Sequence, residues 1–324
     1  MPFRVAMAAA LLIALPAWAD EVPHPQAQSV ATGVWLIPGG IRPNRQPDGN
    51  TIVFDAPGGL IVMDTGRHLW HRAAILDFAK AQGKPIAAIV NSHWHLDHVS
   101  GNPDLRAAYP GLKVYASGAI DGALTGFLPK SAADAKPYLD SGKLPPETME
   151  DLRNDMATIA NGAALKPDVV IDTSAARRIA GKTLDVNLAP DAATAGDVWV
   201  YDPKSRVAAA GDLVTLPAPF LDTACPAGWS RALARIARTP FRVLVPGHGL
   251  PMSRAQFATY RRAFDDFIAC AASPRDAKEC AADWSTAVAA LPGAGPDKQA
   301  QGMAAYYAKD VLRAHGGKSA ECKV

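Results

Sequence analysis

The chain has 324 residues, of which 49% are hydrophobic and 20% are charged, and its formal net charge is +2 at pH 7. This composition is typical of a globular protein that buries a sizeable core. The lysines and arginines are scattered, and no basic run alternates with aromatic residues. We therefore expect no nucleic-acid partner.

Residues 1–19 are predicted to form a secretory signal peptide. An apolar run from Val5 to Leu15 follows a single arginine, and small residues precede the expected cleavage site before Asp20. The alternative is a membrane anchor, but this run is much shorter than the ~20 apolar residues that cross a bilayer. We expect a periplasmic or secreted protein with no stable membrane anchor after cleavage.

The elements that follow, taken in chain order, predict a layered fold of the α/β class. Short β-branched runs occupy residues 32–40, 50–66 and 87–93, and a helical pattern at 69–83 separates the last two. A second series of strand patterns begins near Val169 and ends near residue 249. Two sheet-rich halves that each supply helices predict an αββα sandwich over residues 20–252.

Two helical regions interrupt and extend this domain. Residues 117–166 are polar and helical in pattern, and they are predicted to be an insertion. Residues 253–324 are predicted to be a helical C-terminal extension with Ser253 as its N-cap. No repeat or low-complexity linker divides the chain, so one catalytic domain with a helical tail is expected.

The chain has four cysteines, and an even count in an oxidising compartment indicates disulfides. Cys270 and Cys280 are ten residues apart across a turn, which makes their loop the easiest to close. By elimination, Cys225 would pair with Cys322.

Three of the eight histidines and one aspartate lie within the segment "HWHLDH" at 93–98. Such a cluster is costly in a core without partners, so a metal site is the first explanation. As the preceding strand ends, a period of two places His93 and His95 on one side, whereas Asp97 and His98 lie where the chain turns. These nitrogen and oxygen donors therefore divide between two neighbouring positions of the kind that zinc prefers.

More distant donors also follow strand patterns. Asp212 ends "RVAAAGD", and His248 lies in "VPGHG". A helix-capping aspartate and an ordinary loop histidine are the alternative interpretations, but the presence of the histidine cluster favours ligands.

Together these segments resemble the metallo-β-lactamase superfamily. The matching segments are "MDTG" at 63–66, "SHWHLDH" at 92–98, "TAGD" at 194–197, "AAGD" at 209–212 and "PGHG" at 246–249. The resemblance implies an αββα fold, a metal site at the open edge of the two sheets, and zinc-dependent hydrolysis. It also implies that Asp64 fixes the ligand loop.

The resemblance assigns the ligands to two metal positions. The first would be served by His93, His95 and Asp212. The second would be served by Asp97, His98, His248 and the shared Asp212.

The chain departs from the family's motif at one position. Ala193 stands where a histidine is common in the family, and no histidine occurs between His98 and His248. Asp191 and His68 are the candidates to replace it. We therefore expect one tightly bound zinc in the second position, and a weaker first position that fills only at higher zinc concentration.

The expected function is hydrolysis of an ester, thioester, lactone or amide bond of a small molecule by a metal-bound hydroxide. Asp97 is the candidate catalytic residue, because a carboxylate at the metal edge can orient water or move its proton. Trp94, Phe127, Leu128 and the segment "LPAPFL" at 216–221 are candidate apolar walls of a cleft.

Within the superfamily, the export signal and the cysteine-bearing tail favour the exported hydrolase-like members associated with sulfur or quinoprotein oxidation. Two alternatives stay open. The first is a β-lactamase proper. The second is a non-catalytic metal-binding accessory protein of the periplasm, which Ala193 keeps in consideration. The sequence does not define the oligomeric state.

Overall fold

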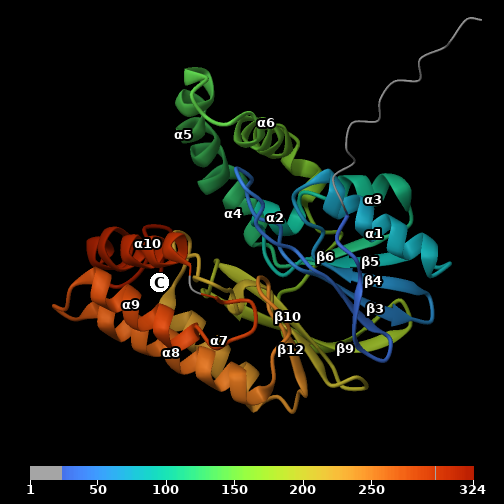
Figure 1. The fold of residues 1–324 in the computed structure, drawn as a ribbon. Coiled ribbons are helices and arrows are strands. Elements are labelled where there is room, and N and C mark those ends of the chain that lie inside the picture. Colours follow the sequence, from blue (N-terminus) through green and yellow to red (C-terminus); the bar gives the residue numbers. More distant parts are fainter. Residues whose placement is uncertain (1–23, 296) are drawn as a thin grey trace, which may run out of the picture.

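The computed structural model describes residues 24–295 and 297–324, so the signal-peptide prediction falls outside the described part. Two β-sheets lie against each other, with helices on both outer sides (Figure 1). This architecture is the αββα sandwich that the sequence predicts. In the described ranges, none of the helices is both long and apolar enough to span a bilayer.

The first sheet contains seven strands in sequence order. The pairings from the first to the fourth strand are antiparallel, and the pairings from the fourth to the seventh strand are parallel. The strands are β1 (Gln28–Ala31), β2 (Val34–Ile37), β3 (Thr51–Ala56), β4 (Gly59–Met63), β5 (Ile86–Val90), β6 (Lys113–Ala116) and β7 (Val169–Val170).

The second series of strands was expected to begin near Val169, but β7 belongs to the first sheet. It pairs in parallel with β6 at the edge of the first sheet. A parallel pair needs a long crossover connection, and the helical insertion between β6 and β7 supplies it. Pairing with such a distant strand is not visible in a two-residue apolar pattern.

The second sheet has the order β12-β11-β10-β9-β8. The strands are β8 (Ala175–Ile179), β9 (Lys182–Pro190), β10 (Gly196–Asp202), β11 (Val207–Ala209) and β12 (Val243–Val245). Only the pair β11–β12 is parallel among these described strands.

The strand period of two divides the core into layers. In β10, Val198 and Val200 pack between the sheets, whereas Trp199 and Tyr201 face the helices on the other side. In β3, Val53 likewise faces outward, toward helix α1. Each sheet therefore buries both faces, as a four-layer sandwich requires.

The helices fall into three groups. Around the first sheet lie α1 (Leu69–Ala81), α2 (Leu96–Val99) and α3 (Asn102–Ala108). The insertion contains α4 (Ala119–Thr125), α5 (Phe127–Ser141), α6 (Pro146–Ala160) and the turn η1 (Gly162–Leu165). Beside the second sheet lie η2 (Gly211–Leu213), α7 (Pro226–Arg238), α8 (Arg254–Ala272), α9 (Ala277–Val288), α10 (Lys298–Tyr306), η3 (Tyr307–Leu312) and η4 (Arg313–His315). Helices α5 and α6 project from the body of the molecule (Figure 1).

The first C-terminal helix, α8, begins as predicted. Ser253 caps α8 through a capping box with Gln256, which satisfies backbone groups at the helix start. Both predicted disulfides are confirmed: Cys270 pairs with Cys280, and Cys225 pairs with Cys322. The second disulfide joins the end of the chain to the start of α7.

Candidate metal centre

The predicted ligands gather where strands of both sheets end. His93 follows β5, and Asp97 and His98 lie in the short helix α2. Asp212 lies in η2 directly after β11, and His248 follows β12. Because these strand ends lie together in the fold, residues that are far apart in the chain meet here.

Two groups of side chains have a geometry that suits a metal ion. His93, His98 and Asp212 form one group, and Asp97, His98 and His248 form the other, with ligand atoms within 4.8 Å of one another in each. Asp212 Oδ1 lies 3.2 Å from His98 Nε2 and 3.6 Å from His248 Nε2, so it stands between the groups.

This grouping differs from the division expected from sequence. His98 belongs to both groups, Asp212 belongs to the first alone, and His95 belongs to neither. His95 is nevertheless adjacent to the first group, because its Nδ1 lies 2.8 Å from His93 Nε2. All six predicted side chains therefore converge on one small region.

Asp64 connects the strand end to the ligand loop. Its backbone is in the left-handed region, with φ of 63°. Its carboxylate accepts hydrogen bonds from Ser92 N at 2.7 Å, Ser92 Oγ at 2.6 Å and His98 Nδ1 at 2.9 Å. These contacts orient the ring of His98 and fix the start of the loop, which is the role expected of the "MDTG" segment.

The same hydrogen bonds determine the tautomer of His93. Ser92 Oγ donates its only proton to the Asp64 carboxylate, so it accepts the 2.9 Å hydrogen bond from His93 Nδ1. His93 therefore presents the lone pair of Nε2 to the centre. There it faces His95 Nδ1 at 2.8 Å and the carboxylate of Asp212 at 3.8 Å, an arrangement that suits a cation.

The charges of the centre also favour a cation. Burial lowers the pKa of His93 well below its usual value and lowers that of His95 to about 4, so both rings are neutral at pH 7. Burial opposes ionisation of Asp97 and Asp212, but the charge of His98 holds the pKa of both carboxyls well below the usual range.

The two carboxylates in turn act on the remaining histidines. Against the effect of burial, Asp212 and Asp97 raise the pKa of His98 and His248. The two carboxylates thus favour the protonated, positively charged form of both rings. A bound divalent ion would place positive charge in the same region. The set of imidazole and carboxylate donors fits zinc.

Two glycines allow the ligand loops to approach one another closely. A Cβ at Gly247 would lie 2.0 Å from Asp212 Oδ1, and a Cβ at Gly49 would lie 2.4 Å from the ring of His98. The first glycine of "PGHG" is therefore required by the packing of a predicted ligand.

Neither candidate for the missing histidine joins the ligand groups. His68 is occupied elsewhere, with Nδ1 2.8 Å from Asp48 and Nε2 3.1 Å from Asp151 of α6. Asp191 is in neither of the groups found among the described residues. Ala193 is buried, and its carbonyl accepts a hydrogen bond from Thr223 at 2.9 Å.

Three further residues lie near the centre and were not predicted from sequence: Arg67, Asp155 and Thr223. Arg67 Nη2 lies 3.8 Å from Asp97 Oδ1, and the same guanidinium contacts Asp155 of α6 through Nη1. Thr223 Oγ1 lies 3.1 Å from His95 Nε2. The position of Arg67 directly after "MDTG" was a usable signal, whereas nothing local marks Asp155 or Thr223.

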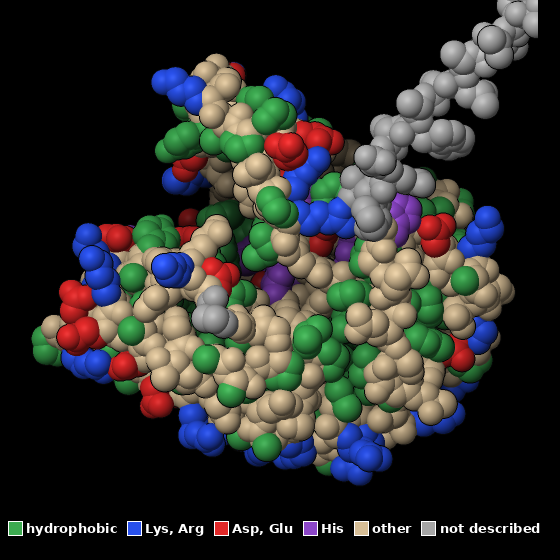
Figure 2. All heavy atoms as spheres, viewed as in Figure 1, with side chains coloured by type: hydrophobic (Ala, Val, Ile, Leu, Met, Phe, Trp, Pro, Cys, Tyr) green, Lys and Arg blue, Asp and Glu red, His purple; other side chains and the backbone are tan. Residues whose placement is uncertain are grey.

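A cavity of about 330 Å³ opens onto the centre and is lined by Asp97, Asp212, His95 and His248. Figure 2 shows histidine side chains at the bottom of a hollow between the projecting helices and the C-terminal helices. Most of the wall residues expected from sequence line this cavity: Trp94, Phe127, Leu128, Leu216, Pro217, Ala218 and Phe220. Pro219 and Leu221 of the expected segment are not among its lining residues.

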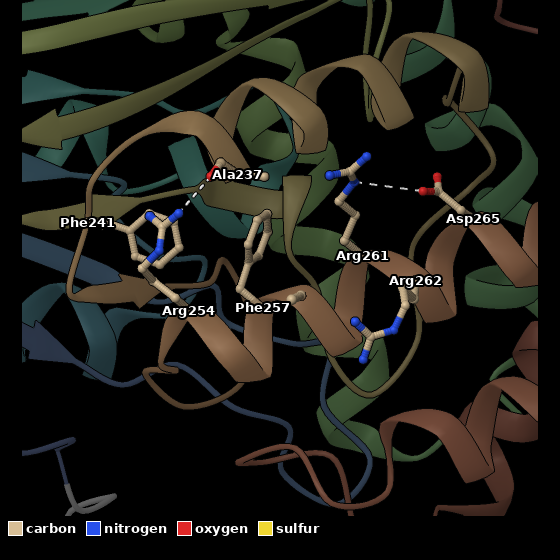
Figure 3. Close-up of a pocket in the computed structure, with 8 residues that line it drawn as sticks. Ala237, Phe241, Arg254, Phe257, Arg261, Arg262 and Asp265 are labelled. Carbon is tan, nitrogen blue, oxygen red and sulfur yellow. Dashed lines mark hydrogen bonds and ion pairs between the residues drawn. The ribbon is translucent and has the colours of Figure 1, made fainter.

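A second cavity, of about 300 Å³, lies over α7 and α8 (Figure 3). Arg254 covers the ring of Phe241 and donates to the carbonyl of Ala237 at 2.8 Å. Arg261 forms an ion pair with Asp265 at 3.8 Å. These arginines already have partners, and the cavity is remote from the predicted ligands.

Comparison with known proteins supports the assignment of the fold. A family model described as "Metallo-beta-lactamase superfamily" matches residues 45–248. The chain is 26% identical over 225 residues to the linear primary-alkylsulfatase of a Pseudomonas species. That match covers 62% of this chain and 41% of the relative, so the chain spans about two-fifths of the relative's length.

Two solved structures share the fold at low sequence identity. A metallo-β-lactamase from Pontibacter korlensis has a TM-score of 0.55 and 20% identity, with 74% of this chain and 99% of that chain covered. A double mutant of the sec-alkyl sulfatase PisA1 has a TM-score of 0.60 and 18% identity, with 87% of this chain and 50% of that chain covered.

Proposed function

Because the chain belongs to the metallo-β-lactamase superfamily, we propose that it is a zinc-dependent hydrolase that cleaves an ester, thioester, lactone or amide bond of a small molecule. The observation that carries this proposal is that Asp97, Asp212, His95 and His248 meet at one side of a largely apolar cavity. A concave site with a few converging polar groups is the usual place for small-molecule chemistry.

The ligand assignment belongs to the same proposal. Asp97, His98 and His248 would hold the tighter zinc, and His93, His95 and Asp212 would hold a weaker one. Bound zinc would lower the pKa of a water molecule and polarise the bond to be cleaved. Three protein ligands are sufficient for a catalytic zinc site that keeps one open position.

We propose Asp97 as the catalytic carboxylate. Its Oδ2 lies 3.0 Å from His248 Nε2, and its Oδ1 faces Arg67 Nη2 at 3.8 Å. The positive charges of His98, His248 and Arg67 keep the pKa of Asp97 low despite burial, so the carboxylate is ionised and accepts hydrogen bonds. It can therefore orient a water molecule toward the substrate bond by accepting a hydrogen bond from it, whereas the low pKa makes this carboxylate a weak base.

A second candidate function is hydrolysis of a sulfate ester that carries an apolar chain. It is favoured by the relative named linear primary-alkylsulfatase and by the combination of Arg67 with apolar cavity walls. Arg67 Nε donates to the carbonyl of Pro47 at 3.2 Å, Nη1 contacts Asp155 and Nη2 lies 3.8 Å from Asp97 Oδ1, while the residue lines the cavity. A guanidinium suits an anionic head group, and Phe127, Leu128 and Phe220 suit its tail.

We also propose that the protein works in the periplasm or outside the cell. The two disulfides fit an oxidising compartment.

The test combines metal analysis with a substrate screen. Purified protein should hold about one zinc equivalent tightly, and it should hydrolyse at least one of four probes: p-nitrophenyl butyrate, an acyl thioester, nitrocefin or dodecyl sulfate. Replacing His248 with alanine should remove the tight zinc and lower hydrolysis more than about 100-fold. Arg262→Ala, remote from the centre in the cavity of Figure 3, is the matched control and should leave both unchanged.

The probes separate the alternatives. Turnover of dodecyl sulfate alone would favour the sulfate-ester function, and turnover of nitrocefin alone would favour a β-lactamase. Tight zinc without turnover of any probe would contradict the hydrolase proposal and support an accessory metal-binding role.

A further inference from the structure

His95 is held, on the side away from His93, by a buried hydroxyl group. Thr223 is 3% exposed, and its Oγ1 lies 3.1 Å from His95 Nε2. The same hydroxyl donates to the carbonyl oxygen of Ala193 at 2.9 Å. Because a hydroxyl has a single proton, Thr223 must accept from His95, and His95 must carry its proton on Nε2.

This tautomer leaves the lone pair of His95 on Nδ1, which lies 2.8 Å from His93 Nε2. His93 also presents a lone pair at Nε2, since Ser92 receives the proton of its Nδ1. Two lone pairs facing each other at this distance cannot form a hydrogen bond. They are arranged instead to share a cation.

We propose that Thr223 is a positioning residue for the first metal position, which it serves by keeping the proton of His95 on Nε2. This inference rests on the proposed zinc site. Ala193 takes part through its backbone, because its carbonyl oxygen fixes the direction of the Thr223 hydroxyl. The chain thus retains an ordered His93–His95 pair although position 193 offers no imidazole.

The C-terminal extension keeps Thr223 in place. Tyr306 of α10 donates to Asp222 at 3.2 Å, and the backbone of Ser319 donates to Ala224 at 3.2 Å. Cys225, two residues after Thr223, is bonded to Cys322. The tail therefore fixes the loop on both sides of the hydroxyl.

Loss of this hydroxyl has a definite chemical consequence. Without Thr223 as acceptor, His95 can move its proton to Nδ1 and donate it to His93. A hydrogen bond then occupies the position, and zinc must displace it.

The experiment compares Thr223→Val, which removes the hydroxyl at nearly equal volume, with Thr223→Ser, which retains it. Zinc affinity is measured by competition with a chelator, and the tautomer of His95 is measured by ¹⁵N NMR of the metal-free protein. Thr223→Val should weaken the second, weaker zinc equivalent about 10- to 100-fold and move the His95 proton from Nε2. Thr223→Ser should preserve both properties.

Thr239→Val is the matched control, because that hydroxyl also donates to a backbone carbonyl, at 3.5 Å, but at the end of α7. The proposal is overturned if Thr223→Val leaves the tautomer and both zinc affinities unchanged, or if Thr223→Ser is as damaging as Thr223→Val. A parent protein that binds no zinc would contradict the proposed function instead, while the NMR spectrum would still decide the role of Thr223.

Discussion

The cavity has two walls that are held to the body of the protein by different forces. The insertion wall consists of residues 117–166, and its helices α5 and α6 bury one side chain each, Leu128 and Asp151. The C-terminal wall consists of the loop at 215–225 and the helices at 253–324 behind it. There α8 alone buries seven side chains, including three phenylalanines.

Ion pairs fasten the insertion wall. Asp151 lies 2.7 Å from Arg45 and 3.1 Å from His68, and Asp155 contacts Arg67. A small apolar cluster around Trp94 and Leu128 adds to these contacts. The C-terminal wall is fastened by a large continuous apolar core and by two disulfides.

The two walls therefore differ in how firmly they are held to the body of the protein. We expect the wall with few buried apolar contacts to unfold locally at a smaller cost in free energy than the wall with a dense core. The wall with a dense core stays in place and supports His95 through Thr223. Agents that weaken ion pairs should therefore act on the insertion first, and agents that weaken the core should act on the whole molecule.

The largest effect is expected for the disulfide behind the C-terminal wall. Cys225 and Cys322 are 97 residues apart, so replacing both with alanine should lower the free energy of unfolding by about 4.7 kcal/mol. The matched control replaces Cys270 and Cys280, which are 10 residues apart, and should cost no more than about 3 kcal/mol. Urea unfolding measures both losses, and an equal loss in the two variants would contradict the expected order.

A slightly smaller effect is expected for aromatic side chains, and it should differ between the walls. Phe264→Ala empties a fully buried position in α8 and should lower the free energy of unfolding by about 3–5 kcal/mol. Tyr138→Ala in α5 removes a side chain that is 65% exposed and should change it by less than about 0.5 kcal/mol. Comparable losses from the two variants in urea would show that the insertion is packed as tightly as the tail.

The smallest of the three effects is the loss of stability at acid pH, which should begin at the insertion wall. Burial acts to raise the pKa of Asp48, but His68 and His71 lower it to about 2, below the value of about 3.9 in an unfolded chain. Its ionised form therefore stabilises the fold above pH ~4, and this contribution of about 2 kcal/mol is lost as the pH falls toward 2. The backbone N of Arg67 also donates a hydrogen bond of 2.7 Å to Asp48 Oδ1.

We expect α6 to lose protection from hydrogen exchange before α8 as the pH falls from 4 to 2. Asp48→Asn should flatten this dependence, whereas Asp134→Asn, at an exposed position of α5, should not. An unchanged pH profile in Asp48→Asn would show that other groups control the acid response.

The sequence was sufficient to predict the sandwich, the six converging side chains and both disulfides. Those predictions rest on local signals: strand periods, the segment at 93–98, and the short separation of Cys270 from Cys280. The sheet to which β7 belongs was not predictable, because it depends on pairing with β6 across the whole insertion.

The residues around the ligands were harder to predict for the same reason. His68 was a candidate ligand, but its Nδ1 lies 2.8 Å from Asp48 and its Nε2 lies 3.1 Å from Asp151, so the ring belongs to a different cluster of side chains. Thr223 contacts His95 across 128 positions of the chain, and its function depends on the direction of one carbonyl group. Such contacts are determined by tertiary packing rather than by residue type.

His98 stands between the two candidate metal positions. Its Nε2 lies 3.6 Å from Asp97 Oδ2 and 3.2 Å from Asp212 Oδ1, while its Nδ1 lies 2.9 Å from the carboxylate of Asp64. An imidazole nitrogen has one lone pair, so Nε2 can serve one ion at a time. Because the proposed assignment gives this lone pair to the second position, the first position would depend on His93, His95 and Asp212 alone.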